Sequence, residues 1–215
     1  MRLRDMDLSR KEVADRLLAR RGVGYDVPAE GYDELYGEEQ IEKYSAIASE
    51  LEREVVGISV VADVGCGTGL LGEYLRSLGF GGLYIGVDLA LERLESAKRR
   101  ADSSWMLIQA DAEHLPLRSR SIDLVACVTV IHLLDVEKAV RELVRVSRGY
   151  LAITLLKKRL DLRDRLLQSI RRSAGEASMR EILRSDLRDL IIVLSYDKDV
   201  ASSPSSTKQR ISNLG

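Results

Sequence analysis

The stretch that most constrains this chain is VVADVGCGTG, which covers residues 60–69. A short apolar run leads into Asp63, three glycines follow at alternate positions, and an apolar-periodic pattern begins at Leu70. This order predicts a buried parallel strand, a tight turn and the start of a helix. Glycine suits such a turn because it can take positive φ and lets a ligand approach bare backbone. The stretch therefore predicts a ligand-binding loop beside the unpaired N–H groups of a helix start.

The spacing of the glycines bears on the kind of ligand. A dinucleotide-binding loop has the pattern G-x-G-x-x-G, with pyrophosphate at the helix N-terminus. Here the third glycine, Gly69, comes one position early, and Leu70 occupies the place of the fingerprint glycine. Asp63 would also repel a pyrophosphate, whereas an acid suits a cation such as the amino group of an amino acid. A nicotinamide dehydrogenase is therefore disfavoured.

Apolar runs and periodic segments alternate regularly after the glycine-rich stretch. Strands are predicted over 58–64, 83–87, 105–109, 122–129 and 150–156, and helices over 70–78, 89–100 and 136–146. This βαβ rhythm predicts an α/β fold with a doubly wound, Rossmann-like, mostly parallel sheet and helices on both of its faces.

The flanking segments are predicted to be mainly helical. Helices are expected over 9–20, where Ser9 and Glu12 form a capping box, and over 38–54, with Ile41, Tyr44, Ile47, Ala48 and Leu51 on the buried face. Further helices are predicted over 162–173 and 182–187, followed by a strand over 190–196. No further strand is evident after residue 196, so the edge of the sheet is expected to be truncated or completed by a partner.

Composition narrows the class of protein. The chain has 215 residues and is 45% hydrophobic, which fits one domain with a full core. Its net charge of −1 gives no overall attraction to nucleic acid or anionic membrane. The two cysteines suggest neither a disulfide framework nor a metal site, and no apolar run approaches the roughly 18 residues of a membrane span. These features predict a cytoplasmic protein without a metal.

Two later acids follow predicted strands. Asp88 lies 23 residues after Gly65, where acids in nucleoside-binding α/β folds accept hydrogen bonds from ribose hydroxyls. Asp111 follows the third predicted strand and lies in the passage QADAEHLPL, at residues 109–117. The passage SIDLV comes shortly afterwards, at residues 121–125. The glycine loop and this passage together resemble class I S-adenosylmethionine (SAM) methyltransferases, whose patterns are acid-x-G-x-G-x-G and D-A-x-x-L-P-φ…F-D-φ-V, where φ is apolar. Ile122 is the one departure from these patterns, because it occupies the position where the family usually has an aromatic residue.

The resemblance implies a seven-stranded sheet with one antiparallel edge strand, and SAM as cofactor. In its terms, residues 1–55 form a helical lid, 56–200 the SAM-binding core and 201–215 a flexible tail of one methyltransferase domain. It assigns the amino-acid end of SAM to the loop around Asp63, the ribose to Asp88 and the adenine to Asp111 with Ala112. The full set of implied cofactor contacts is Tyr36, Tyr44, Asp63, Gly65, Cys66, Gly67, Asp88, Leu89, Asp111, Ala112 and Thr129.

The loop after the fourth strand reaches the acceptor in this family. It lacks the Asn/Asp-Pro-Pro-aromatic tetrapeptide, which disfavours adenine-N6 and glutamine-N5 methylation. His132 is the candidate catalytic residue, either as a general base or as a residue that packs or orients the substrate. Tyr36 and Tyr44 either cover the cofactor or belong to the helix core.

The sequence leaves several interpretations of the methyl acceptor. Residues 157–172 carry seven bases against two acids, which favours RNA or a translation-related protein as acceptor, or else marks a solvated helix face. Some relatives of this kind need a small zinc-binding activator subunit. The alternatives are a small-molecule methyltransferase and a non-catalytic SAM-binding subunit of a heteromer.

Overall fold

The computed structural model describes residues 29–51 and 57–196. The helix predicted over 9–20 and the tail 201–215 lie outside the described residues. The strands are β1 (Val60–Val64), β2 (Leu83–Asp88), β3 (Trp105–Gln109), β4 (Ile122–Cys127), β5 (Ser147–Leu156), β6 (Ser178–Ile182) and β7 (Asp189–Ser195). The helices are α2 (Ala29–Leu51), α3 (Leu70–Ser77), α4 (Leu91–Lys98), α5 (Val136–Val146) and α6 (Arg163–Ala174), with 3₁₀ segments η1 (Ile131–Leu133) and η2 (Lys157–Leu162).

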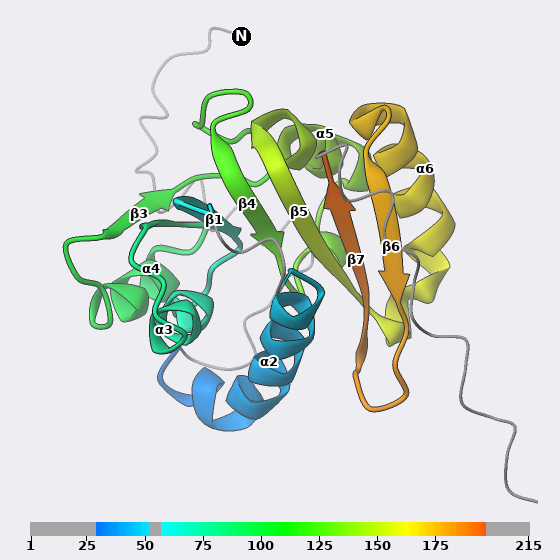
Figure 1. Cartoon of the computed structure of the whole chain (residues 1–215). Coiled ribbons are helices and arrows are strands. Elements are labelled where there is room, and N and C mark those ends of the chain that lie inside the picture. Colours follow the sequence, from blue (N-terminus) through cyan, green and yellow to red (C-terminus); the bar gives the residue numbers. More distant parts are fainter. Residues whose placement is uncertain (1–28, 52–56, 197–215) are drawn as a thin grey trace, which may run out of the picture.

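The strands form one seven-stranded sheet in the order β3-β2-β1-β4-β5-β7-β6 (Figure 1). Strands β1 to β5 pair in parallel, and β7 runs antiparallel to both β5 and β6. The chain order reverses at β1, where β1 lies between β2 and β4. Ligands of such sheets bind beyond the carboxyl ends of the strands at this reversal, so the glycine loop after β1 occupies the expected place.

Two apolar cores cover the two faces of the sheet. One joins the sheet to α5 and α6, and the other joins it to α2 and α3. The central strands are buried on both faces of the sheet. All seven residues of β7 are buried, and so are seven of the ten residues of β5. Continuous apolar runs of this kind are typical of strands covered by helices on both faces.

Most predicted elements have the predicted type. The strand over 105–109 and the helix over 136–146 match β3 and α5 residue for residue. The doubly wound fold is confirmed, and so is the antiparallel strand. No helix in the part of the chain described here is long and apolar enough to cross a membrane.

The prediction for helix α2 was wrong in its start and in one buried position. The helix begins at Ala29 and passes through Gly37, which was expected to precede it. Gly37 is buried, and a Cβ there would lie 3.9 Å from Leu70, so the helix packs closely against α3 at this point. Ile41 is 43% exposed, whereas Gln40 and Lys43 are buried instead.

The helix predicted over 182–187 was also wrong. Strand β6 ends at Ile182 and a turn leads directly into β7, so the sheet's antiparallel edge is complete. Strand β6 has only one strand partner, and its side chains are half-buried or exposed. Its sequence therefore lacks the apolar pattern of a central strand, and tertiary pairing with β7 decides its conformation.

Candidate cofactor and acceptor site

The glycine loop is fixed to the carboxyl end of β2. The backbone N–H groups of Gly65 and Cys66 both donate to Val87 O, at 2.7 and 3.0 Å. Gly65, Gly67 and Gly69 have φ of 79°, 53° and 81°, a region that glycine enters without strain. A Cβ on Gly67 would meet no atom within 4 Å, so the backbone is open to a ligand there.

Asp88 bridges the glycine loop and the start of α4. Its Oδ2 accepts from Gly67 N at 2.8 Å and its Oδ1 accepts from Ala90 N at 2.9 Å. The side chain is 7% exposed, and burial raises its pKa even though these hydrogen bonds lower it. Each carboxylate oxygen can accept a second hydrogen bond, so Asp88 retains capacity for ligand hydroxyl groups.

Asp63 lies at the same edge but faces inward. The residue is 3% exposed, and its Oδ2 accepts from the Tyr84 hydroxyl at 2.6 Å. Burial is the largest influence on this carboxyl and raises its pKa from 3.8 to about 7. In this structure Asp63 is therefore a buried hydrogen-bond partner of Tyr84 on β2, and its role at a ligand ammonium stays a prediction.

The third acid, Asp111, follows β3. Its Oδ1 accepts from Glu113 N at 3.0 Å, which fixes a turn after the strand. Ala112 is buried, and the Gln109 side chain donates to Leu89 O at 3.1 Å. Since Asp88 and Gln109 are register partners in adjacent strands, Asp88, Leu89, Asp111 and Ala112 lie along one edge of the sheet.

The acceptor-side loop begins at Thr129, whose φ is 61°. His132 follows in η1 and is half-buried. Burial lowers the pKa of His132, and Arg159 lowers it further, so the imidazole is neutral at pH 7. Its Nδ1 atom has no hydrogen-bond partner among the residues described in this structure.

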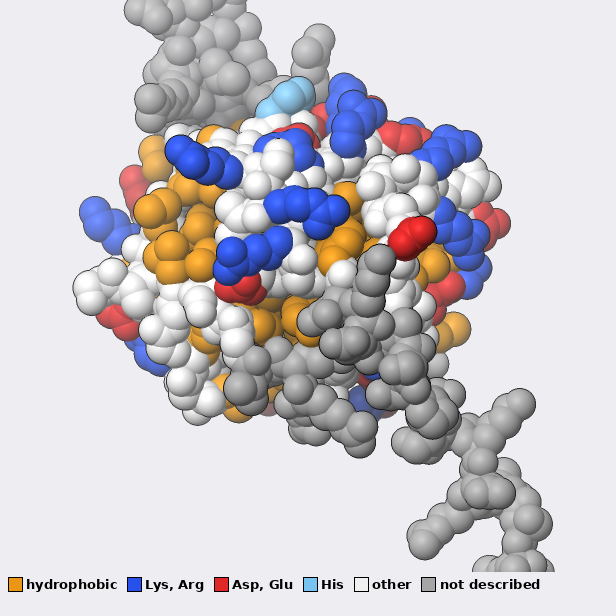
Figure 2. Space-filling model, turned by 45° about the horizontal axis from the view of Figure 1, so that its top comes forward, with side chains coloured by type: hydrophobic (Ala, Val, Ile, Leu, Met, Phe, Trp, Pro, Cys, Tyr) orange, Lys and Arg blue, Asp and Glu red, His pale blue; other side chains and the backbone are white. Residues whose placement is uncertain are grey.

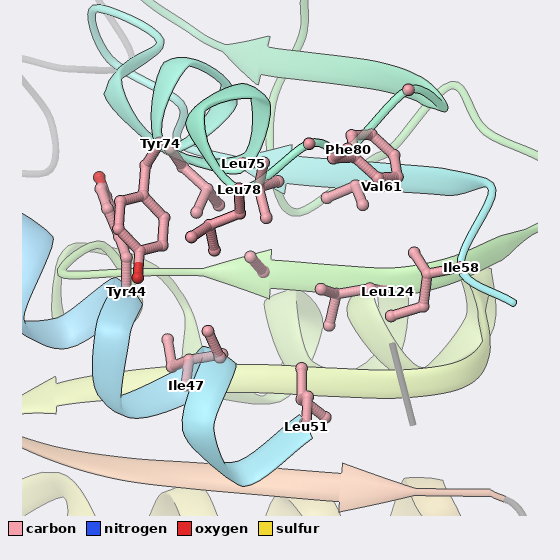
Figure 3. A pocket seen from close by; sticks show the side chains of 15 residues that line it. Tyr44, Ile47, Leu51, Ile58, Val61, Tyr74, Leu75, Leu78, Phe80 and Leu124 are labelled. Atoms are coloured by element: carbon pink, nitrogen blue, oxygen red, sulfur yellow. The ribbon is translucent and has the colours of Figure 1, made fainter. Parts of the chain in front are cut away.

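The two tyrosines of α2 differ in their surroundings. Tyr36 is 36% exposed, whereas Tyr44 is 8% exposed and packs its ring 5.7 Å from that of Tyr74. Tyr44 also lines an apolar cavity of about 250 Å³ between α2, α3 and the sheet (Figure 3). Tyr44 is thus a core residue, the alternative expected from sequence, and a role for either tyrosine at the cofactor stays a prediction.

Both cysteines are buried free thiols. Burial raises the pKa of Cys66 well above its usual value, and the nearby carboxylates of Asp88 and Asp63 raise it further. Burial similarly raises the pKa of Cys127 to about 12. Both side chains therefore remain protonated near neutral pH, and Cys66 contributes packing beside the glycine loop.

Two polar clusters around α2 were not anticipated from sequence. In the first, Arg100 pairs with Asp33 and donates to Thr68 O at 3.2 Å, and the Thr68 hydroxyl donates to Asp33 at 2.6 Å. This cluster fastens the first turns of α2 over the glycine loop. The second cluster is centred on Lys43, which contacts Glu39, Thr129 and Asp189. A lysine within an apolar stripe was the one available sequence signal for it.

The basic segment 157–172 lies partly at the carboxyl edge of the sheet, where η2 follows β5. Several of its bases are paired with acids: Arg159 with Asp161, Arg163 with Glu181 and Arg165 with Glu137. The local net positive charge is therefore smaller than the count of bases in the sequence indicated.

The topology and the acids at the ends of β2 and β3 define a class I SAM-dependent methyltransferase fold. Residues 62–153 match the family model of a methyltransferase domain, and this segment contains Asp63, Asp88, Asp111 and His132. This segment of the chain therefore carries a methyltransferase domain. The predicted family is confirmed.

Curated relatives match part of the chain, and two of them illustrate the extent of the match. An uncharacterized protein of Methanocaldococcus jannaschii is 31% identical over 58% of this chain and 46% of its own length. A malonyl-[acyl-carrier protein] O-methyltransferase of Hamiltonella defensa is 37% identical over 42% of this chain and 34% of its own length. The chain thus covers less than half the length of either relative.

Solved structures share the fold at low identity. One such structure is the complex between the Trm112 methyltransferase activator and a candidate methyltransferase of Haloferax volcanii. A chain of this complex matches with a TM-score of 0.61 and 13% identity, and the match covers 87% of this chain and 99% of that chain. The magnesium protoporphyrin IX methyltransferase of Synechocystis, with bound SAM, has a TM-score of 0.61 and 16% identity, over 89% and 99% of the two chains.

Proposed function

We propose that this protein binds SAM at the carboxyl edge of β1, β2 and β3 and transfers its methyl group to an acceptor. The observation that carries the proposal is the placement of Asp88 beside Gly67, where the backbone is open, with Asp111 at the end of the next strand. Two carboxylates on adjacent strands suit the ribose and the adenine of one nucleoside.

Each candidate residue has a role that its surroundings support. Asp88 would accept from the ribose hydroxyls with its remaining lone pairs, next to Leu89. Asp111 would accept from the adenine amino group, and Ala112 N–H would donate to the ring. Gly65, Cys66 and Gly67 would admit the amino-acid end, with Asp63 acting on its ammonium through water.

SAM, when bound, supplies an electrophilic methyl group that an already nucleophilic acceptor attacks in line. The protein then contributes mainly by positioning the acceptor and excluding water. Where the acceptor carries a proton, His132 would take it as a general base, because its lowered pKa keeps the imidazole neutral. Thr129 would direct the loop that carries His132 toward the acceptor.

For the acceptor we propose an RNA or a translation-related protein. The support is the position of Lys158 and Arg159 in η2, beside the loop of His132, where Arg159 Nη1 lies 3.5 Å from His132 O. A small-molecule acceptor is the second candidate, favoured by the ion pairs that offset the charge of segment 157–172.

Labelled methyl transfer to fractionated RNA, protein and small-molecule pools tests this proposal directly. Binding to total RNA at two salt concentrations provides the second test. A Lys158→Glu/Arg159→Glu variant should weaken RNA binding and reduce its salt slope by about 0.7–0.9 for each phosphate that the variant no longer neutralises. The matched control is Arg171→Glu/Arg172→Glu at the far end of α6. Equal weakening in both variants, or transfer only into the small-molecule pool, would exclude RNA.

A small zinc-binding activator is the proposed protein partner. Its support is the edge strand β3, which has one strand partner and where Met106 is 48% exposed. Figure 2 shows hydrophobic side chains gathered on the left of the molecule, the side on which Figure 1 places β3. A chain of the solved complex with the Trm112 activator shares this fold. Co-expression with such an activator should raise the yield of folded protein, and a Met106→Glu variant should lose that gain.

A further inference from the structure

A cluster of buried polar side chains joins α2 to the end of β4 and the start of β7. The side chains of Lys43 and Asp189 have no exposed area, and Lys43 Nζ lies 3.0 Å from Asp189 Oδ1. Lys43 Nζ also donates to Glu39 Oε1 at 2.7 Å and to Thr129 Oγ1 at 3.0 Å. Lys43 thus makes two hydrogen bonds and one ion pair within this cluster.

Thr129 is the strained member of this cluster. Its φ of 61° lies in the left-handed region, which a β-branched residue adopts only when its surroundings enforce it. The Thr129 N–H donates to Thr154 Oγ1 at 2.8 Å, and Thr154 Oγ1 donates to Asp189 Oδ2 at 2.6 Å. The backbone of Thr129 is therefore held by Thr154. Its hydroxyl accepts from Lys43 at 3.0 Å, the shortest of its contacts, and has longer hydrogen bonds with Asp189 at 3.3 Å and Gln40 at 3.4 Å.

The left-handed turn at Thr129 determines the course of the acceptor-side loop. The next residue, Val130, fills the space beside Gly65, where a Cβ would lie 2.4 Å from Val130 Cγ2. Ile131 is then fully buried, and His132 follows. A change of φ at Thr129 would therefore move both the contact with the glycine loop and the position of His132.

We propose that Lys43 is a positioning residue that holds Thr129 in its strained conformation and thereby sets the acceptor-side loop against the glycine loop. The inference rests on the proposed function, since the loop matters there because it places His132 and the acceptor. Helix α2 thus takes part in methyl transfer through one buried lysine that does not itself touch SAM. Arg188 lies 3.0 Å from Glu39 and balances the second carboxylate of the cluster.

The burial of an ion pair does not by itself explain this cluster. A buried pair often contributes no more stability than well-packed apolar side chains of similar volume. The distinguishing feature is the hydrogen bond that Lys43 donates to the hydroxyl of Thr129, a residue with positive φ. The positioning role therefore makes a prediction that a purely structural role does not: the effect of removing Lys43 should depend on which residue stands at 129.

The first test leaves the ion pair in place. Thr129→Val keeps the β-branched strain but removes the hydroxyl, whereas Thr129→Gly removes both the hydroxyl and the strain. We expect hydrogen exchange of the amides of 129–133 to be faster by about tenfold or more in Thr129→Val and to stay within about threefold of the unmodified chain in Thr129→Gly. Equal acceleration in the two variants would overturn the proposal.

The second test removes the lysine together with its counter-charge, so that no buried charge is left unpaired. In Lys43→Met/Asp189→Asn the same amides should exchange faster, and adding Thr129→Gly should restore most of their protection. Lys98→Met, at an exposed lysine on α4, is the matched control. Unchanged exchange in the double variant, or no restoration by Thr129→Gly, would each overturn the positioning role.

Binding and turnover separate this inference from the proposed function. We expect Lys43→Met/Asp189→Asn to bind SAM within about threefold of the unmodified chain but to transfer methyl at least about tenfold more slowly in single turnover. Failure of the unmodified chain to bind SAM would reject the proposed function, while the exchange data would still decide the role of Lys43. Normal transfer by a variant with an opened loop would reject the link between Lys43 and catalysis.

Discussion

Asp63 and Asp88 lie at the ends of neighbouring strands, yet the fold uses their carboxyl groups differently. Asp88 accepts from two backbone N–H groups and keeps free lone pairs near the open backbone of Gly67. Asp63 accepts from Tyr84 inside the sheet and has a pKa raised to about 7. The first is therefore suited to bind a ligand, and the second changes charge near physiological pH.

At the residue scale, Asp88→Ala should weaken SAM binding at least tenfold, about 1.4 kcal/mol, because charge-assisted hydrogen bonds are removed. Titration calorimetry with SAM measures this effect. Asp88→Asn keeps one carbonyl acceptor and should lose less affinity. The exposed Asp102→Ala is the control for removing a carboxylate elsewhere. Unchanged affinity in a folded Asp88→Ala protein would refute the ribose assignment.

Asp63→Asn should alter how stability depends on pH. The pKa of the Asp63 carboxyl is about 7 in the folded protein and about 3.8 in the unfolded chain. The contribution of this group to the free energy of unfolding is therefore fully favourable below pH 4 and is lost as pH rises toward 7. At pH 8 the variant should be more stable than the unmodified chain, by up to about 4 kcal/mol at 1.4 kcal/mol per pKa unit. Urea unfolding at pH 5 and pH 8 measures it; an equal difference at both values would contradict the assignment.

At the scale of elements, helix α3 depends on one glycine for its contact with the sheet. A Cβ on Gly72 would lie 2.5 Å from the Trp105 ring and 2.9 Å from Tyr84 Cζ. The Trp105 ring cannot easily retreat, because its centroid lies 4.3 Å from that of the Tyr84 ring. The position of α3, and with it the glycine loop at its start, therefore follows from this close approach.

Gly72→Ala should destabilise the protein by roughly 1–3 kcal/mol through overpacking against Trp105. In an unconstrained helix the same change would stabilise by about 1 kcal/mol, so the sign itself is informative. Gly81→Ala, where a Cβ would meet no atom within 4 Å, is the control. Denaturant unfolding of both variants is the measurement, and a Gly72→Ala protein as stable as the control would show that the ring moves freely.

At the scale of the whole molecule, the described residues form one seven-stranded sheet whose antiparallel edge completes the core against α6. SAM or S-adenosylhomocysteine should therefore stabilise the chain as a unit. At a ligand concentration of 100 times Kd the expected gain is about 2.7 kcal/mol, or about 5–10 °C in Tm for a chain of this size. Thermal unfolding with and without ligand measures this shift. An equal shift in Asp88→Ala would indicate binding at another place.

The elements that could be predicted from sequence are those with strong local patterns. The glycine stretch predicts the turn after β1, and the continuous apolar runs predict β1, β4 and β5, because burial on both faces leaves few polar positions. Strand β6 could not be predicted, since an edge strand with exposed side chains has no such pattern. The start of α2 was missed because Gly37 normally ends helices, whereas here it packs against Leu70.

The sequence by itself determined which acids follow which strands, because parallel strands bring their carboxyl ends to one edge whatever the details of packing. Only the tertiary structure decided that Asp63 faces Tyr84 and that Lys43 reaches Thr129, across 86 residues of chain. Such contacts depend on the rotation of α2 and on burial, which removes water and makes each charge require a specific partner. Local sequence patterns record periodicity along the chain, but they carry no information about which distant polar group that partner will be.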